Sequence, residues 1–343
     1  MFDTLHVPDE HRYDGRMKYR RCGRSGLLLP EISLGCWHNF GDRTPPEQQR
    51  SMIFKAFDLG ITHFDLANNY GPPFGAAERN VGRILKQLPR DELAISTKAG
   101  YIMWPGPHGE WGSRKHLLAS LDQSLRRLGV DYVDIFYSHR LDAETPLEET
   151  LGALDSAVRA GKALYVGISS YPSDQTQSAI DICRDNKLQR LLIHQPNYSM
   201  LNRWIEERLL DVCDDAGLGV IAFCPLYQGL LTDKYLSGVP TLSRHVVAPH
   251  FLRELDMQPA ILDSIRKLNN IARERGQSLA QMSIAWILRD PRITSVLCGA
   301  SGVDQIVENC HAVNHARFTD EELLQINDVL VPIKMPQSLW AAD

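Results

Sequence analysis

Four polar side chains of types that perform acid–base chemistry lie close to the ends of three apolar segments. Asp65 and Tyr70 belong to FDLANNYG, Lys98 ends STK, and His139 belongs to YSHR. A tyrosine hydroxyl titrates near pH 10, but a nearby ammonium stabilises the phenolate and lowers that pKa. A carboxylate would keep the ammonium charged, and a neutral histidine would hold a carbonyl oxygen. The set predicts a general acid that protonates a carbonyl oxygen under hydride attack.

Each of the four residues also has a plainer interpretation when it is taken alone. Asp65 would cap a turn, and Tyr70 would belong to a tight loop with the prolines that follow it. Lys98 would be a solvated strand end, and His139 a hydrogen-bonded core histidine. The functional interpretation therefore rests on their joint placement at the ends of successive strands.

Eight apolar runs of strand length define the elements that must position these residues. Leucines at helical spacing occupy the gaps, as at residues 117–128 and 147–158. The runs are continuously apolar, as expected for strands covered on both faces. We predict an α/β fold, a (β/α)8 TIM barrel, whose reactive groups lie at the C-terminal ends of the strands. The runs span residues 32–37, 63–67, 93–98, 133–139, 163–169, 191–195, 220–225 and 294–299.

Other elements frame this barrel. Residues 17–22 and 27–29 flank a glycine-containing turn and predict an N-terminal β-hairpin. Thr145 to Glu148 predicts a capping box with Pro146 at the first helical position, and Thr319 to Glu322 a similar box. Residues 226–259 lack periodicity and predict a long loop after the seventh strand, of the kind that forms lids or binding loops.

The domain organisation is expected to be simple. Residues 1–16 are polar and predict a flexible N-terminus, and residues 17–343 predict a single barrel domain without a linker. No window of about 18 apolar residues and no signal-peptide core occurs. Seven cysteines without a CxxC pattern predict reduced thiols in the cytoplasm.

Composition and absent motifs exclude several classes of function. A net charge of -5 offers no basic field for nucleic acid or a membrane surface. The twelve histidines show no HExxH or clustered spacing, so no metal site is expected. No GxGxxG follows a strand, because GLGVIA at 217–222 precedes one, and no P-loop occurs. GISSY at 167–171 lacks the last glycine of a nucleophile elbow.

The segments that carry the candidate residues resemble a known family. GITHFD at 60–65, followed by NYG at 69–71, resembles the first signature of the aldo-keto reductases. STK and SH resemble its next two catalytic segments, and the likeness runs from Met17 to the helix after Thr319. CWHNFG, MWPGP and LNRW resemble the subgroup of bacterial L-glyceraldehyde 3-phosphate reductases, which is related to potassium-channel β subunits.

The resemblance implies a role for each matching residue. Tyr70 would donate the proton, with Asp65, Lys98 and His139 completing a tetrad, and NADPH would supply the hydride. Ser169 and Gln195 would hold the nicotinamide carboxamide. Phe223 would stack on its ring, although core packing also explains Phe223. The implied cofactor-binding set is Gly35, Trp37, Asp65, Ser169, Gln195, Phe223, Pro225, Leu226, Gln228, Gly229, Lys234, Arg244, Gly299, Ser301, Gln305, Glu308 and Asn309.

One departure concerns the choice between NADPH and NADH. Many family members carry a lysine or arginine for the 2′-phosphate in the stretch that corresponds to residues 298–309, which here contains none. In the channel-related subgroup, cations of the loop after the seventh strand serve instead. Lys234 and Arg244 match those positions, or are solvated loop charges. The helix start in this stretch would favour a phosphate through its free N–H groups and dipole.

The expected substrate is a small aldehyde of the glyceraldehyde 3-phosphate or methylglyoxal class. Trp37 and Trp104 would wall its pocket beside Tyr70 and His139. Arg140 and Arg203 would bind a substrate phosphate, or are surface salt bridges.

Two alternatives of other classes stay open, and the protein is expected to form a homo-oligomer. The first is a redox-sensing subunit that acts through a partner protein. The second is a barrel lyase that uses Lys98 as a Schiff base.

Overall fold

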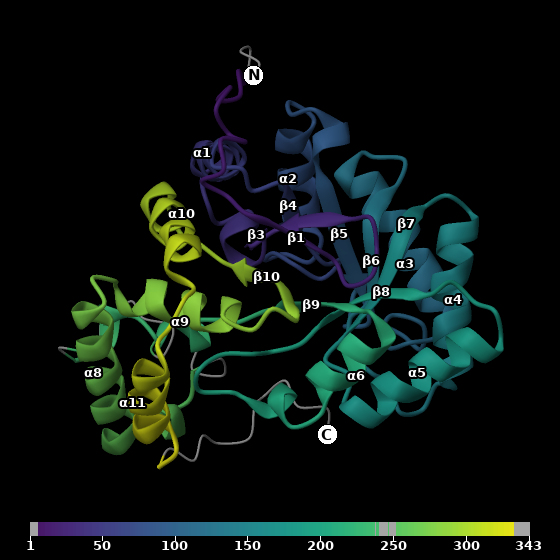
Figure 1. The fold of residues 1–343 in the computed structure, drawn as a ribbon. Coiled ribbons are helices and arrows are strands. Elements are labelled where there is room, and N and C mark those ends of the chain that lie inside the picture. The colour runs from purple at the N-terminus through teal and green to yellow at the C-terminus, as the bar shows by residue number, and fades with distance from the viewer. Residues whose placement is uncertain (1–5, 237, 240–245, 247–251, 333–343) are drawn as a thin grey trace.

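A computed structural model of the chain describes residues 6–236, 238–239, 246 and 252–332. Eight parallel strands close into a barrel in the order β10-β3-β4-β5-β6-β7-β8-β9, which confirms the predicted (β/α)8 architecture (Figure 1). The strands are β3 (Ile32–Gly35), β4 (His63–Asp65), β5 (Ala94–Ala99), β6 (Val133–Ser138), β7 (Ala163–Ser169), β8 (Leu191–Gln195), β9 (Gly219–Ala222) and β10 (Ile293–Cys298).

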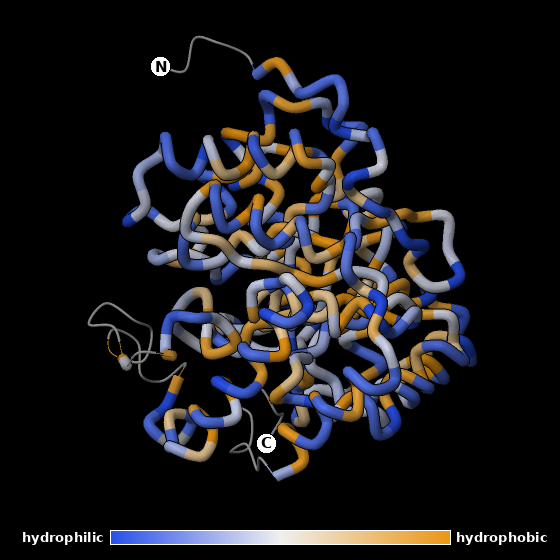
Figure 2. The backbone as a smooth tube through the Cα atoms, turned by 60° about the vertical axis from the view of Figure 1, so that its left-hand side comes forward, coloured by the Kyte–Doolittle hydropathy of each residue, from blue (hydrophilic) through white to orange (hydrophobic). Residues whose placement is uncertain are grey.

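Helices surround the strands, and most of them bury one apolar face. In α3, Leu117, Leu121 and Leu128 are buried at the spacing that the sequence predicts. Hydrophobic stretches lie along the strands of the interior, and hydrophilic ones are common at the outer turns (Figure 2). The helices are α1 (Pro46–Asp58), α2 (Ala76–Leu85), α3 (Arg114–Leu128), α4 (Leu147–Arg159), α5 (Ser173–Asp185), α6 (Leu209–Ala216), α8 (Pro259–Glu274), α9 (Leu279–Leu288), α10 (Val303–Cys310) and α11 (Asp320–Leu330).

The predicted hairpin lies at the N-terminal end of the barrel. Strands β1 (Tyr19–Arg21) and β2 (Leu28–Pro30) pair antiparallel, and the amide of Arg24 in their turn donates to the carbonyl of Gly217 at 2.9 Å. Gly217 lies two residues before β9, so the hairpin turn lies at the strand entrances. The C-terminal strand ends, where the reactive groups are predicted, form the opposite end of the barrel.

The polar segment before the hairpin has partners among its described residues. His6 stacks on Phe54 at 4.1 Å between ring centroids, and Arg12 donates two hydrogen bonds from Nη2 to Glu92. These contacts join residues 6–16 to the outside of the barrel. The flexible N-terminus and the single domain stay predictions.

The two predicted capping boxes have different outcomes. At Thr319 the prediction is confirmed. Thr319 Oγ1 accepts from the Glu322 amide at 3.2 Å, and the Glu322 carboxylate accepts from the Thr319 amide at 2.8 Å. At Thr145 it is wrong, because the hydroxyl donates to Asp142 at 2.5 Å instead. Pro146 then becomes the N-cap of α4 and has no side-chain cap.

The segment after β9 contains short 3-10 helices among its described residues. They are η4 (Tyr227–Gly229), η5 (Asp233–Tyr235) and η6 (Glu254–Met257). Leu230 and Leu231 are fully buried, so the start of this loop is packed onto the barrel.

Candidate active site

Strand register brings the predicted tetrad to one end of the barrel. Asp65 on β4 lies beside Ser96 on β5, and Lys98, two residues further along β5, faces the same side as Ser96. Tyr70 follows β4 and His139 follows β6, whose neighbour in the barrel is β5. Three consecutive strands thus supply all four residues.

The centre of the site is a buried ion pair between Lys98 and Asp65. Their side chains are 0% and 3% exposed, and Lys98 Nζ also donates to the carbonyl of Leu66 at 2.7 Å. The second carboxylate oxygen of Asp65 accepts from Ser96 at 2.6 Å and from Gln195 at 3.2 Å. Burial lowers the pKa of Lys98, and the Asp65 carboxylate opposes that effect.

Tyr70 lies beside this pair, but its hydroxyl is farther from the Lys98 ammonium than the acceptors of Asp65 and Leu66 are. The distance from Lys98 Nζ to the phenolic oxygen is 3.4 Å. Burial, followed by the charge of Asp65, raises the pKa of Tyr70 well above its usual value. The expectation of a lowered pKa is therefore wrong, because the Lys98 charge is largely balanced by Asp65 while the phenol is desolvated.

His139 completes the group as a neutral imidazole. Its ring is 5.8 Å from the Tyr70 ring between centroids, at an interplanar angle of 70°. Burial lowers its pKa well below the usual value, and the charges of Lys98 and Arg140 lower it further. Its Nδ1 is buried without a hydrogen bond to any residue in the described part of the chain. A neutral histidine agrees with the role predicted for it.

A series of side-chain hydrogen bonds that ends at Asp65 was not predicted from the sequence. His63 bonds Ser33 through Nδ1 and Ser96 through Nε2, both at 2.9 Å, and Ser96 in turn donates to Asp65. Burial lowers the pKa of His63 to about 4, which keeps it neutral. The available signal was spacing, because His63 and Ser96 stand two residues before Asp65 and Lys98, and alternate residues of a strand share a face.

The residues predicted to hold the nicotinamide lie next to the tetrad. Ser169 and Gln195 are register partners on β7 and β8, and Ser169 Oγ donates to the Gln195 carbonyl at 2.8 Å. The Gln195 side chain reaches Asp65, which joins this pair to the ion pair. Phe223 is half-buried and packs against an inner apolar cluster.

The loop that begins at Phe223 has an unusual backbone. Cys224, Tyr227 and Gln228 have φ values of 56°, 43° and 58°, a region that favours glycine, and Gly229 follows at 95°. Several such residues in succession are characteristic of ligand-binding loops. Pro225, Leu226, Gln228 and Gly229, all in the predicted cofactor set, belong to this segment.

The other half of the predicted cofactor set surrounds the start of α10. Gln305 Oε1 accepts from the Ser301 amide at 2.8 Å, and Asn309 is buried while Glu308 is half-buried. Gly302, the N-cap, has no side-chain cap. Gly299 is exposed, and Gly35 lies beside the end of β10, where an added Cβ would be 3.8 Å from the Cys298 carbonyl oxygen.

Only one of the two candidate 2′-phosphate cations is among the described residues. Lys234 is exposed in η5 and forms no ion pair with a described residue. Arg244 lies outside the described residues.

A nicotinamide cofactor fits this end of the barrel on a further observation. Asn68, two residues before Tyr70, is fully buried, yet both polar atoms of its side chain lack a partner within the described ranges. His139 Nδ1 is in the same situation. Buried polar groups without partners are rare in folded proteins and point to a missing ligand. Asn68 was also absent from the sequence-based set.

The predicted substrate residues are only partly brought together. The Trp37 ring is 6.0 Å from Tyr70 between centroids, whereas the Trp104 ring contacts His116 at 5.0 Å. Arg140 forms an ion pair with Glu110, and Arg203 pairs with Glu206 and donates to Asn327 at 2.8 Å. Both arginines therefore have carboxylate partners in this structure.

The described residues contain no group of three or more histidine, cysteine, aspartate or glutamate residues arranged to hold a metal ion. None of their helices has the length and apolar character that crossing a membrane requires.

Comparison with known proteins gives consistent results. The model of the aldo/keto reductase family matches residues 31–331. An Escherichia coli (strain K12) protein named L-glyceraldehyde 3-phosphate reductase is 56% identical, over 98% of this chain and 98% of its own. A protein of Arabidopsis thaliana named probable voltage-gated potassium channel subunit beta is 36% identical, over 87% of this chain and 92% of its own. A rice protein with the same name is 34% identical, over 93% and 98%.

Proposed function

The chain belongs to the aldo/keto reductase family, an oxidoreductase family, and from that premise we propose that it reduces small aldehydes to alcohols with NADPH. Bound NADPH would supply the hydride. Tyr70 would supply the proton, so that an aldehyde gains one hydride and one proton. The observation that carries the proposal is the contact of Tyr70 with the buried Lys98–Asp65 pair beside a neutral His139.

Each residue of the tetrad has a separate task in this proposal. Asp65 keeps Lys98 charged and in position, since a buried lysine without a carboxylate tends to lose its proton. The ammonium, 3.4 Å from the Tyr70 oxygen, stabilises negative charge as the phenol releases its proton. The imidazole of His139 donates a hydrogen bond to the carbonyl oxygen and orients it.

The raised pKa of Tyr70 is compatible with its role as an acid. The phenol is protonated across the neutral range, so the proton-donating form is the populated one. A carbonyl carbon that receives a hydride leaves an alkoxide oxygen, a stronger base than a phenolate. Proton transfer to that oxygen therefore stays favourable.

The cofactor would extend from Phe223 and the Ser169–Gln195 pair to the start of α10. The start of α10, where no side chain caps the helix, would offer backbone N–H groups to its phosphates. Lys234 is our candidate for the 2′-phosphate partner, because it is exposed and unpaired in the described part of the loop.

The proposed substrate class rests on the family and on the E. coli relative. The E. coli relative is named for L-glyceraldehyde 3-phosphate, and the same site would accept the smaller methylglyoxal. The Schiff-base alternative is less compatible, because the Lys98 ammonium already contacts Asp65, Leu66 and Tyr70. A homo-oligomer and a cytoplasmic location stay predictions.

The experiment is a panel of aldehydes with NADPH and with NADH, followed by loss of the nicotinamide absorbance band. We expect many turnovers per enzyme with NADPH and with glyceraldehyde 3-phosphate or methylglyoxal. A single-turnover burst would instead identify the redox-sensing subunit. Loss of a carbonyl substrate without cofactor oxidation, with Lys98 trapped by borohydride, would identify the lyase.

A further inference from the structure

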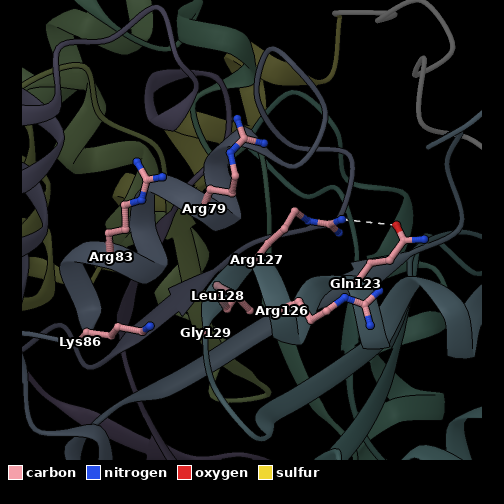
Figure 3. Close-up of a pocket in the computed structure, with 8 residues that line it drawn as sticks. All are labelled: Arg79, Arg83, Lys86, Gln123, Arg126, Arg127, Leu128 and Gly129. Atoms are coloured by element: carbon pink, nitrogen blue, oxygen red, sulfur yellow. Dashed lines mark hydrogen bonds between the residues drawn. The ribbon is translucent and has the colours of Figure 1, made fainter.

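A cleft rich in cations lies on the outside of the barrel, between α2 and α3, which pack against each other. Its volume is about 430 Å³. Figure 3 shows arginine and lysine side chains on both helices that flank it. The charged and polar residues that line it are Arg79, Arg83, Lys86, Gln123, Arg126 and Arg127, and no carboxylate is among the lining residues.

Only two of these five cations are neutralised. Arg79 pairs with Asp42 at 3.1 Å, and Arg127 pairs with the buried Glu78 at 2.6 Å. The other three, Arg83, Lys86 and Arg126, are exposed and form no ion pair with a residue that the structure describes. Three unpaired cations in one cleft repel one another, in a chain whose net charge is -5. A bound anion would remove that repulsion.

The cleft is also held in shape by its surroundings. Arg127 is fixed from three sides by Glu78, Gln123 and Ser124. An added Cβ at Gly82 would be 2.4 Å from the Leu128 carbonyl oxygen, so the two helices approach closely there. The wall of the cleft formed by Arg127 and the helix crossing is therefore in place before a ligand binds, which lowers the conformational entropy lost on binding.

Helix dipoles explain only part of this arrangement. Arg83 lies in the last turn of α2, and Arg126 and Arg127 lie in the last turn of α3, where cations are favoured. Each such contact contributes roughly 0.3–1 kcal/mol at an exposed position. That effect places single charges at each helix end. It does not require cations of both helix ends to line one cleft that has no carboxylate in its lining.

The cleft is separate from the proposed active site. Leu128 and Gly129 end α3 just before β6 begins, and Lys86 ends α2 before β5, so the cleft extends toward the strand entrances. The tetrad follows the strand exits at the opposite end. None of the lining residues belongs to the proposed cofactor or substrate sites.

We infer that this cleft binds a compact polyanion with two phosphate groups, such as pyrophosphate or a bisphosphorylated metabolite. Three separated unpaired cations suit two linked phosphates better than one. The lining contains no aromatic side chain on which a nucleobase would stack, which favours a ligand without a base.

Titration calorimetry with pyrophosphate tests the inference. The protein is saturated with NADPH first, so that the proposed cofactor site is filled. The double variant Arg83→Gln/Arg126→Gln removes two unpaired cations of the cleft. Lys115→Gln/Arg266→Gln is the matched control, because it makes the same charge change at exposed positions elsewhere.

We expect one pyrophosphate per chain, weaker binding at higher salt, and inorganic phosphate binding more weakly than pyrophosphate. The cleft variant should lose roughly tenfold or more in affinity while the control keeps the wild-type value. Circular dichroism and aldehyde reduction check that both variants fold. Absence of binding, equal affinity in the cleft variant, or an equal loss in the control would each overturn the inference. The result does not depend on the proposed enzymatic activity, because binding is measured directly.

Discussion

Arg140 lies over the rings of Tyr101 and Trp111, with its guanidinium carbon 4.2 Å and 3.7 Å from their centroids. It also donates to the Gly100 carbonyl at 3.2 Å and pairs with Glu110. Tyr101 in turn contacts the His139 ring edge-on at 4.7 Å between centroids. Arg140 thus joins the loop between β5 and α3 to the site.

Arg140 is therefore expected to act through the loop rather than by binding a substrate phosphate. Arg140→Lys keeps the charge but loses the stacking and the forked geometry. We expect KM to rise roughly tenfold for both glyceraldehyde 3-phosphate and methylglyoxal, because loss of the stacking contacts is of the order of 1 kcal/mol or more. Steady-state kinetics with the two aldehydes checks this. An increase confined to the phosphorylated aldehyde would restore the predicted phosphate-binding role.

Tyr70→Phe removes the proposed proton donor and keeps the ring. We expect kcat to fall by roughly 10² to 10⁴-fold, the usual contribution of a general acid. Cofactor affinity, followed by quenching of protein fluorescence, should stay unchanged. Tyr101→Phe, a neighbouring tyrosine outside the tetrad, serves as the control and should retain most of the activity. Wild-type turnover in Tyr70→Phe would reject the mechanism.

Lys98→Met leaves the Asp65 carboxylate buried without its ammonium. We expect a loss of about 3–5 kcal/mol in the free energy of unfolding, together with loss of reduction. Denaturant unfolding measures it. The double variant Lys98→Met/Asp65→Asn should be less destabilised than the sum of the single variants, because it leaves no unpaired charge. Strict additivity would show that the pair is not coupled.

The pH dependence of reduction follows from two pKa shifts. The pKa of Tyr70 is raised, so the acid form persists until well above pH 10, and the pKa of His139 is lowered, so the imidazole stays neutral to well below pH 6.5. The rate of reduction should therefore be nearly constant between about pH 6 and 9. A rate that falls through the neutral range would indicate a lowered pKa of Tyr70 in the complex.

Stability should respond to acid through the buried histidines. His63 and His194 both have a pKa lowered to about 4 by burial. Between about pH 6.5 and 4 the unfolded chain binds protons that these residues cannot take up when folded, so stability falls as the pH falls. Each contributes roughly 3 kcal/mol across that window. The stability difference between pH 7 and 4.5 should shrink in His63→Gln and not in His311→Gln, which changes an exposed histidine.

Much of the fold was predictable because local sequence patterns indicate its strands and helix starts. The eight apolar runs became the eight barrel strands, and Thr319 became the expected cap. Thr145 differed because Asp142, three residues earlier, offered its hydroxyl a charged acceptor. A sequence pattern shows which groups are able to bond, whereas competition between nearby partners is decided in three dimensions.

Sequence patterns alone indicated which residues lie near the C-terminal ends of the strands, because strand periodicity and strand ends depend on neighbours along the chain. Asp65, Tyr70, Lys98 and His139 were predicted in this way. The direction in which the pKa of Tyr70 shifts depends on three-dimensional contacts, namely burial and a Lys98 charge that Asp65 already balances. Register between strands likewise placed Ser96 against Asp65, and helix packing gathered the cations of α2 and α3 in one cleft. Such contacts join residues far apart in the chain, where local patterns carry no information.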